Sequence, residues 1–325
     1  MSEILEVKNL KTYFRTPDGL VKAVDDISFN LEEGEILALV GESGCGKSVT
    51  VQTLLGLIKV PPAKVEGEIF YKGKNLVGLS NKAYRDIRGK EISMIFQEPM
   101  SAFDPLYTIG FQLTEVARAH MTWDQIRTYD EIISILRRVN IPEPEKRYRE
   151  YPHEMSGGML QRIMIAMALI TNPEIVVADE PTTALDVTIQ AQVLNIMREL
   201  QGEFGSSIIF ITHDLGVVAE LADRVHVMYA GKIVEKSGVK ELYSSPSHPY
   251  TKGLLSSRVT RSFKGKKLPY IEGYVPRAYE FPEGCRFNPR CPHAMELCRN
   301  KDPPEFYVGE DHTAACWLFE GGSEK

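Results

Sequence analysis

The sequence predicts a mixed α/β fold in which buried parallel strands alternate with helices. Three observations support this prediction. Short apolar runs at 36–40, 175–178 and 208–212 have the length and composition of strands that are buried on both faces. A glycine-rich loop, Gly41–Ser48, follows the first run directly. Helical patterns, such as the one at 187–201, separate the later runs.

The glycine-rich loop fits the pattern G-x-x-x-x-G-K-[ST], which is typical of a phosphate-binding loop, and a helix is expected from Gly46 to Leu57. Glycines let backbone N–H groups surround a β-phosphate, and the helix N-terminus adds positive potential. Lys47 can reach the β- and γ-phosphates, and the Ser48 hydroxyl can bind Mg²⁺. The pattern predicts a nucleoside triphosphate site that includes Gly41, Ser43, Gly44, Cys45, Gly46, Lys47, Ser48 and Val49, with Cys45 in a structural role.

Polar side chains follow the two later apolar runs. Asp179 is placed to hold the Mg²⁺ shell, and Glu180 to polarise the water that attacks the γ-phosphate. His213 follows the third run, where we favour a contact to the γ-phosphate. The alternatives are a strand that ends in a solvated turn and a histidine with a structural role.

The segment Met155–Arg162 opens the helix that runs to about Ile170. By itself, its Ser-Gly-Gly sequence also fits a helix N-cap with permissive glycines. In its position before the Asp179 strand end, it resembles the signature of the ATP-binding cassette (ABC) family. Five further segments match that family in order, over roughly residues 4 to 240: the phosphate-binding loop, the Q-loop Gln97, the Asp179–Glu180 strand end, the D-loop Ala184–Asp186 and the switch residue His213. Phe14 matches the aromatic residue that stacks on adenine, with Tyr13 as the neighbouring alternative.

The resemblance implies a P-loop NTPase core with an antiparallel β subdomain and a helical subdomain. It also implies a dimer in which Ser156, Gly157 and Gly158 of one subunit close on the ATP held by a second ABC ATPase subunit. Gln97 would contact Mg²⁺ and link the nucleotide to a transmembrane partner. Glu180, Gln97 and His213 would form the catalytic set, and Ser48, Gln97 and Asp179 the Mg²⁺ set.

Other segments resemble the oligopeptide/dipeptide importer branch of the family: 180–188, 213–218, 247–251, 284–292 and 312–316. This implies an ATPase that drives import of di- or oligopeptides through two transmembrane permease subunits at the cytoplasmic face of the membrane, supplied by an extracellular peptide-binding protein. The alternatives are nickel or another small solute as cargo, a soluble ABC ATPase outside transport, and a regulatory module without turnover. One departure is Leu160, where the branch often has arginine.

Composition agrees with these expectations. The net charge of −6 argues against a nucleic-acid partner, which normally faces a basic surface. No uncharged apolar run is long enough to span a bilayer, and the N-terminus lacks the features of a signal peptide. We therefore expect a cytosolic chain that reaches the membrane through a partner.

The chain is expected to divide into a nucleotide-binding domain at 1–255 and a C-terminal extension at 256–325. Short strands and turns are expected over 1–35, with a hairpin turn at 16–19. A helical subdomain is expected at about 102–169, with helices at 111–119 and 125–139. The stretch 258–282 is expected to be a linker.

Four cysteines lie in the last 41 residues, with the spacing C-x₅-C-x₆-C-x₁₇-C, and few large apolar residues accompany them. Small segments without a core usually need a covalent or metal staple, and a cytosolic setting disfavours disulfides. A thiolate-only set suits a [4Fe–4S] cluster, and some importers that this tail resembles carry one. Zinc and four buried free thiols are the alternatives. The predicted ligands are Cys285, Cys291, Cys298 and Cys316.

Overall fold

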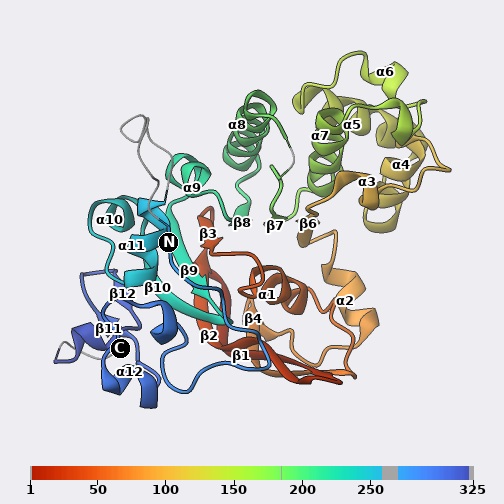
Figure 1. Ribbon diagram of the computed structural model, residues 1–325. Coiled ribbons are helices and arrows are strands. Elements are labelled where there is room, and N and C mark those ends of the chain that lie inside the picture. Colours follow the sequence, from red (N-terminus) through yellow and green to blue (C-terminus); the bar gives the residue numbers. More distant parts are fainter. Residues whose placement is uncertain (1, 184, 258–269, 322–325) are drawn as a thin grey trace. The chain divides into compact units, whose positions relative to one another are not determined.

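The computed structural model describes residues 2–183, 185–257 and 270–321. The chain forms two compact units (Figure 1). Unit 1 comprises residues 1–3, 31–36 and 78–211, and unit 2 comprises residues 4–30, 37–77 and 212–325.

Unit 1 contains a parallel sheet of three short strands in the order β8-β7-β6. These are β6 (Ile92–Ile95), β7 (Ile175–Asp179) and β8 (Ser207–Thr212), with Ile92 opposite Ile175 and Ile175 opposite Ser207. Every residue of β7 and β8 is buried, as the apolar runs predicted. Helix α8 (Val187–Phe204) connects these two strands, and the short α2 (Asn81–Ile87) precedes β6.

The helical part of unit 1 is inserted between β6 and β7. Its main helices are α4 (Ile109–His120), α5 (Gln125–Arg138) and α7 (Gly157–Leu169), which lie together in Figure 1. Each begins at a polar N-cap whose side chain accepts a backbone N–H, namely Thr108, Asp124 and Ser156. Shorter turns connect them: α3 (Pro99–Ala102), α6 (Pro144–Arg147) and the 3₁₀ turn η1 (Pro152–Glu154).

Unit 2 contains an antiparallel sheet in the order β2-β1-β4-β5. The strands are β1 (Glu3–Thr16), β2 (Gly19–Glu32), β4 (Ala63–Tyr71) and β5 (Lys74–Asn75). The hairpin turn was predicted correctly, but β1 and β2 are 14 residues each instead of short strands. The pairing of β1 with β4 shifts register between Lys8 and Lys11, where Asn9 has φ 47°. This bulge interrupts the period-two pattern, which made one long strand look like several.

The second sheet of unit 2 carries the glycine-rich loop. Strand β3 (Ile36–Val40) pairs in parallel with β9 (Arg224–Tyr229), which forms an antiparallel hairpin with β10 (Lys232–Gly238). Helix α1 (Lys47–Leu54) follows the loop and ends earlier than expected, because Gly56 adopts a left-handed φ of 58°. Helices α9 (Leu215–Leu221), α10 (Val239–Ser244) and α11 (Pro249–Ser256) complete this part.

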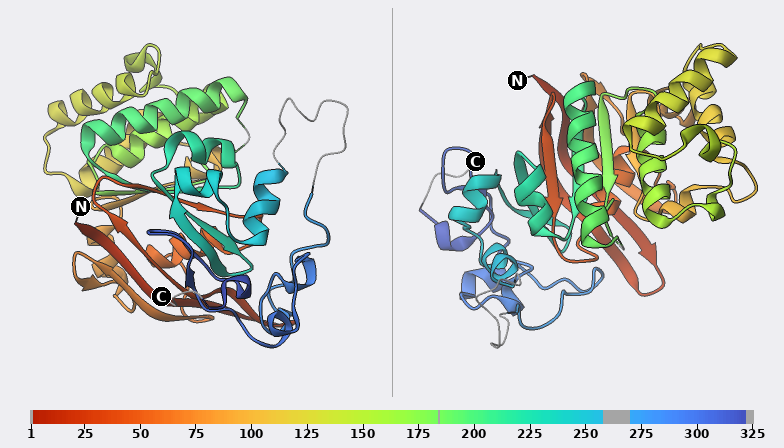
Figure 2. Two further views of the ribbon diagram at one scale, coloured as in Figure 1. Left: turned by 90° about the vertical axis from the view of Figure 1, so that its left-hand side faces the viewer. Right: turned by 90° about the horizontal axis from the view of Figure 1, so that it is seen from above.

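The C-terminal extension belongs to unit 2 and adds to this sheet. Strand β12 (Thr313–Ala314) pairs with β10, and β11 (Phe306–Tyr307) pairs with β12. The blue extension lies against β9 and β10 in Figures 1 and 2. Around these strands are η3 (Asn288–Arg290), α12 (Glu296–Asn300) and η4 (Trp317–Phe319). Residues 258–269 of the expected linker lie outside the described residues.

The extension docks through buried aromatic side chains, although few large apolar residues were expected to accompany its cysteines. Phe287 is 2 % exposed and packs against Tyr229 and Tyr250, with ring centroids 5.2 and 5.5 Å away. Phe306 is 1 % exposed and contacts the ring of Trp317. The extension therefore shares a hydrophobic core with β9 and α11, instead of depending on a staple alone.

Within the described ranges, the structure contains no helix whose length and apolar character would let it cross a bilayer.

Candidate functional site

The glycine-rich loop has a backbone that only glycine fits at two positions. Gly41 and Gly46 have φ values of 154° and 108°. A Cβ at Gly41 would lie 2.2 Å from the carbonyl oxygen of Met228, and one at Gly46 would lie 2.3 Å from that of Ala23. The neighbouring backbone therefore shapes the loop, and side chains at these positions are excluded by contact as well as by φ.

Lys47 begins α1 and is 4 % exposed. Its ammonium donates to the carbonyl oxygens of Gly41 at 2.8 Å and Glu42 at 3.2 Å, so the charge lies over the loop. Ser48 and Val49 follow in the first turn of α1 and are half-buried. This arrangement brings together, within unit 2, the cation, the hydroxyl and the helix N-terminus that phosphate binding requires.

Cys45 is buried inside the loop, and burial raises the pKa of its thiol although Lys47 lies nearby. Its carbonyl oxygen accepts the backbone N–H of Gly231 at 2.9 Å. These contacts support the structural role expected for Cys45.

The two aromatic candidates for the adenine site have different surroundings on β1. The hydroxyl of Thr12, which lies on the same strand face as Phe14, hydrogen-bonds Thr53 of α1 at 2.9 Å. The Tyr13 hydroxyl donates instead to Asp25. Phe14 is half-buried and on the face of β1 that carries the contact to α1, which favours it over Tyr13.

The carboxylates predicted at the end of β7 lie in unit 1. Asp179 is 5 % exposed, and Glu180 is half-buried with a left-handed φ of 47°. The Glu180 carboxylate accepts the hydroxyl of Thr183 at 2.9 Å and the side-chain amide of Gln97 at 3.3 Å. The structure thus brings Gln97 and Glu180 together within unit 1.

The signature segment opens α7 with Ser156 as its N-cap. The Ser156 hydroxyl accepts the Met159 N–H at 3.3 Å, and Ser156 and Gly157 are exposed. A Cβ at Gly158 would come within 3.0 Å of Ile189 in α8, so a larger residue would disturb that contact. Leu160 is 0 % exposed, so this position faces the interior of unit 1 and its apolar character is explained by packing.

The remaining predicted segments flank helices. His213 follows β8, is exposed and lies in unit 2 with the Lys47 loop, whereas Asp179 and Glu180 lie in unit 1. In the D-loop, Asp186 caps α8 by accepting the N–H groups of Thr188 and Ile189, both at 3.0 Å. Ala184 lies outside the described residues.

Two polar contacts of unit 2 were not expected from the sequence. Arg290 of the extension forms an ion pair with Glu42 of the loop at 2.7 Å. Glu235 of β10 is buried and accepts hydrogen bonds from the 247–251 and 312–316 segments. In the sequence those segments indicate only a branch of a family, and neither carries a local signal for a contact with Glu235.

The four C-terminal cysteines are neighbours in unit 2. Burial raises the pKa of Cys285 to about 12 and that of Cys316 to about 11, with further increases from the neighbouring thiols. Among the described residues, however, no group of three or more His, Cys, Asp or Glu side chains is arranged to hold a metal ion. The predicted cluster therefore stays a prediction.

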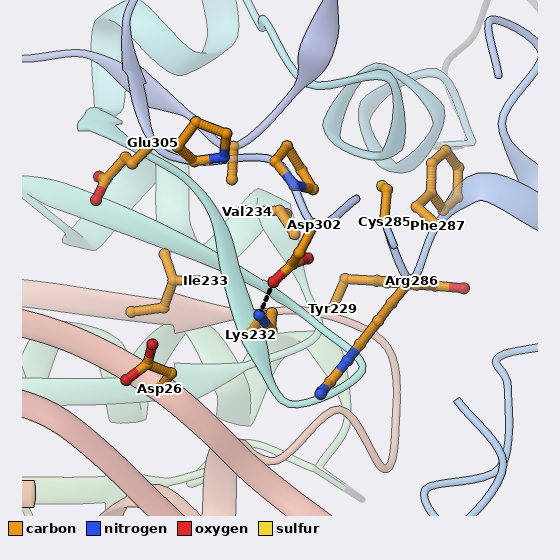
Figure 3. A pocket seen from close by; sticks show the side chains of 13 residues that line it. Asp26, Tyr229, Lys232, Ile233, Val234, Cys285, Arg286, Phe287, Asp302 and Glu305 are labelled. Carbon is orange, nitrogen blue, oxygen red and sulfur yellow. Dashed lines mark hydrogen bonds and ion pairs between the residues drawn. The ribbon is translucent and has the colours of Figure 1, made fainter. Parts of the chain in front are cut away.

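A cavity of about 340 Å³ lies between the extension and β10 (Figure 3). Lys232 and Asp302 form an ion pair at its wall, and Cys285 lies near its edge. Arg286 extends away from Cys285 and donates to Asp25 and to the Ala230 carbonyl oxygen. Charged side chains thus hold the extension to β2, to β10 and to the β9–β10 turn.

Comparison with protein families gives two matches. Residues 24–183 match the model described as "ABC transporter". Residues 234–298 match the model described as "Oligopeptide/dipeptide transporter, C-terminal region". The second match covers most of β10, all of α11 and the first three cysteines of the extension.

Individual proteins give the same result. The chain is 49 % identical to the dipeptide transport ATP-binding protein DppD of Bacillus subtilis, over 100 % of this chain and 97 % of that protein. It is 48 % identical to the oligopeptide transport ATP-binding protein OppD of the same organism, over 100 % and 91 % of the two chains. Among solved structures, the dimeric bacterial ABC transporter cassette MJ0796 is similar, with a TM-score of 0.65 and 25 % identity over 72 % of this chain and 98 % of that chain.

Proposed function

Because this chain belongs to the ABC transporter family, in its oligopeptide/dipeptide branch, we propose that it is the ATP-hydrolysing subunit that powers import of di- or oligopeptides. Its relatives of almost equal length are named as dipeptide and oligopeptide transport ATP-binding proteins. The single observation that supports this function most strongly is the full-length similarity, which includes the C-terminal extension as well as the nucleotide-binding segments.

In the proposed reaction, MgATP binds at the glycine-rich loop. Lys47 neutralises charge on the β- and γ-phosphates. Ser48 and Asp179 would hold Mg²⁺, which would offset further charge on the phosphates. Glu180 accepts the proton of the attacking water, and its contacts with Thr183 and Gln97 fix the direction of its carboxylate. His213 holds the γ-phosphate.

We propose that two ATPase subunits act as a pair, either identical or related. Ser156 and Gly157 are exposed at the N-terminus of α7. Because a helix N-terminus carries positive potential, this exposed end is suited to bind an anion. The Lys47 loop belongs to the other compact unit, so each chain contributes two phosphate-binding devices. In the pair, the signature of one subunit closes on the nucleotide of the other, as the similarity to a dimeric cassette supports.

The helical part of unit 1 carries a surface suited to a membrane partner. Large apolar side chains are exposed around α3 and α4: Leu106 at 80 %, Met100 at 58 %, Phe111 at 49 % and Tyr107 at 46 %. The Tyr107 and Phe111 rings stack with centroids 4.6 Å apart. Contiguous exposed apolar groups mark interaction sites. We assign this surface to one of two permease subunits, which receive peptide from an extracellular binding protein, and we propose that the chain lies at the cytoplasmic face of the membrane.

Reconstitution tests this function directly. The full-length chain should copurify with its permease subunits and drive ATP-dependent uptake of a labelled dipeptide or oligopeptide into proteoliposomes containing the binding protein. Nickel uptake in the same vesicles tests the alternative cargo. ATPase activity that never associates with membrane subunits would contradict the transport function.

We also propose that Cys285, Cys291, Cys298 and Cys316 ligate a [4Fe–4S] cluster. What supports it is the thiolate-only donor set, which falls within residues 285–316 of the extension. The cluster would have a structural role in the extension, and zinc is the competing metal.

A further inference from the structure

Glu42, the second residue of the glycine-rich loop, is held at three points. Its N–H donates to the Tyr250 hydroxyl of α11 at 2.9 Å. Its carbonyl oxygen accepts from the Lys47 ammonium at 3.2 Å. Its carboxylate accepts hydrogen bonds from both terminal nitrogens of Arg290, at 2.7 and 3.1 Å. The loop is therefore tied at this residue to α11, to α1 and to the C-terminal extension.

Arg290 uses every one of its donors. Besides Glu42, the guanidinium donates to the backbone oxygens of Glu272 at 3.0 Å and Ile271 at 3.4 Å, and to the Tyr229 hydroxyl at 3.4 Å. These contacts and the two to Glu42 account for all five N–H groups of an arginine side chain. The Arg290 side chain is only 4 % exposed, so solvent and salt screen its bond to Glu42 weakly.

The geometry of this pair connects it to nucleotide binding. The Lys47 ammonium donates to the backbone carbonyl oxygens of Gly41 and Glu42. Movement of Glu42 therefore also moves the acceptors that hold the Lys47 ammonium. The Arg290 fork fixes both carboxylate oxygens, which restricts rotation as well as translation of the Glu42 side chain. A lysine at position 290 would supply charge without this two-point hold.

We propose that Arg290 is a positioning residue for the glycine-rich loop, holding Glu42 so that the loop keeps the conformation that binds the nucleotide's phosphates. Through it the C-terminal extension sets the affinity of the ATPase for nucleotide. This inference rests on the proposed assignment of the Lys47 loop as the phosphate site.

The test measures MgATP and MgADP dissociation constants of the full-length chain with a fluorescent ATP analogue, together with KM and kcat for ATP hydrolysis. Arg290→Gln and Glu42→Gln each remove one side of the ion pair, and the double variant removes both. Arg290→Lys keeps the charge. Asp302→Asn is the matched control, because it breaks another ion pair of the extension, to Lys232, that does not involve the loop.

We expect Arg290→Gln and Glu42→Gln to weaken binding of both nucleotides about tenfold and to raise KM more than they lower kcat. Arg290→Lys should recover part of the affinity, and the double variant should bind no more weakly than either single one, because one interaction is lost in all three. Asp302→Asn should stay within about twofold of the native chain.

Unchanged affinity in a folded Arg290→Gln protein would overturn the proposal, as would equal losses in Asp302→Asn. If Arg290→Gln does not fold, Glu42→Gln decides, because it leaves the other contacts of Arg290 in place. Lys47→Ala distinguishes failure of the proposed phosphate site from failure of the positioning role. Normal nucleotide affinity in Lys47→Ala would refute the assignment of the loop as the phosphate site. Weakened affinity in Lys47→Ala with normal affinity in Arg290→Gln would refute only the positioning role of Arg290.

Discussion

The imidazole of His312 contacts the carboxylate of Glu235 with 2.7 Å between Nε2 and Oε1. The two side chains are 3 % and 0 % exposed. Glu235 also accepts the N–H groups of Ser247 and His248, at 2.7 and 2.9 Å. One buried carboxylate of β10 thus joins the start of α11 to the C-terminal extension, which gives a physical reason for the two histidine-containing segments.

Glu235→Gln should lower the free energy of unfolding of the chain by about 2–4 kcal/mol at pH 7, because an amide donates where the carboxylate accepted and leaves buried donors unpaired. Denaturant unfolding monitored by circular dichroism measures the loss. Glu241→Gln is the matched control: Glu241 lies 4.0 Å from the other nitrogen of His312, but its side chain is 56 % exposed. A similar loss in both variants would contradict the importance of the buried carboxylate.

His248 should make stability depend on pH. Its Nδ1 accepts the Tyr250 N–H at 3.0 Å, and burial lowers its pKa from 6.5 to about 4 although Glu235 opposes the shift. The unfolded chain therefore binds a proton between pH 6.5 and about 4 that the folded chain does not. Stability should fall as pH decreases through this window, by up to about 1.4 kcal/mol per pH unit.

His248→Asn keeps an N-cap acceptor for α11 and removes the titrating group, so it should flatten this part of the stability profile. Denaturant midpoints measured at intervals from pH 4 to 7 provide the check, with the exposed His153→Asn as control. An unchanged slope in His248→Asn would assign the pH dependence to other groups.

Glu235 affects stability at lower pH than His248 does. Burial raises the pKa of Glu235, but the hydrogen bonds from His312, Ser247 and His248 lower it overall. The stability that Glu235 contributes is therefore lost as pH falls further.

The parts of the fold that were predictable have strong local signals. Strands β3, β7 and β8 are continuous apolar runs because both faces of each are buried, and the loop requires glycine at Gly41 and Gly46 for steric reasons. The length of β1 was not predictable, because the bulge near Asn9 breaks the alternating pattern.

Contacts made by the extension had no local signal. Strands β11 and β12 have two residues each, too few to show any periodicity. Arg290 and Glu42 are 248 positions apart, and nothing in either segment specifies the other. Opposite charges occur throughout the chain, so only tertiary placement selects which of them meet. The pairing of Gln97 with Glu180 needed the family resemblance for the same reason.

Glu180→Gln should nearly abolish ATP hydrolysis while leaving ATP affinity within a few-fold of native. The substitution removes the carboxylate proposed to activate water but keeps Lys47, Ser48 and Asp179. Loss of a general base typically costs about 10²–10⁴-fold in rate. Phosphate release and equilibrium binding measure the two effects. Size-exclusion chromatography with MgATP should show a dimer that the native chain does not accumulate. Near-normal turnover would refute the catalytic role of Glu180.

Lys47→Ala and Ser156→Arg should fail in different ways. Lys47→Ala removes the charge proposed to meet the phosphates and should weaken nucleotide binding itself. Ser156→Arg alters the exposed start of α7, so nucleotide should still bind one subunit while ATP-dependent dimerisation and turnover are lost. Nucleotide titrations and light scattering distinguish the two results. Equal loss of nucleotide affinity in both variants would argue that the signature does not act across a subunit interface.

The protein purified without oxygen should be brown and contain about four iron and four acid-labile sulfide atoms per chain, as a [4Fe–4S] cluster requires. Cys291→Ser should lower iron content and the visible absorbance, because it removes one of four thiolate ligands. Cys45→Ser is the matched control, because Cys45 is buried in the glycine-rich loop and should leave the iron content unchanged. Since Arg290 directly precedes Cys291, nucleotide affinity measured in the same samples would reveal whether loss of the metal disturbs the Glu42 ion pair. Colourless protein that contains zinc and neither iron nor sulfide would replace the cluster by a zinc site, and metal-free protein with normal stability would refute both.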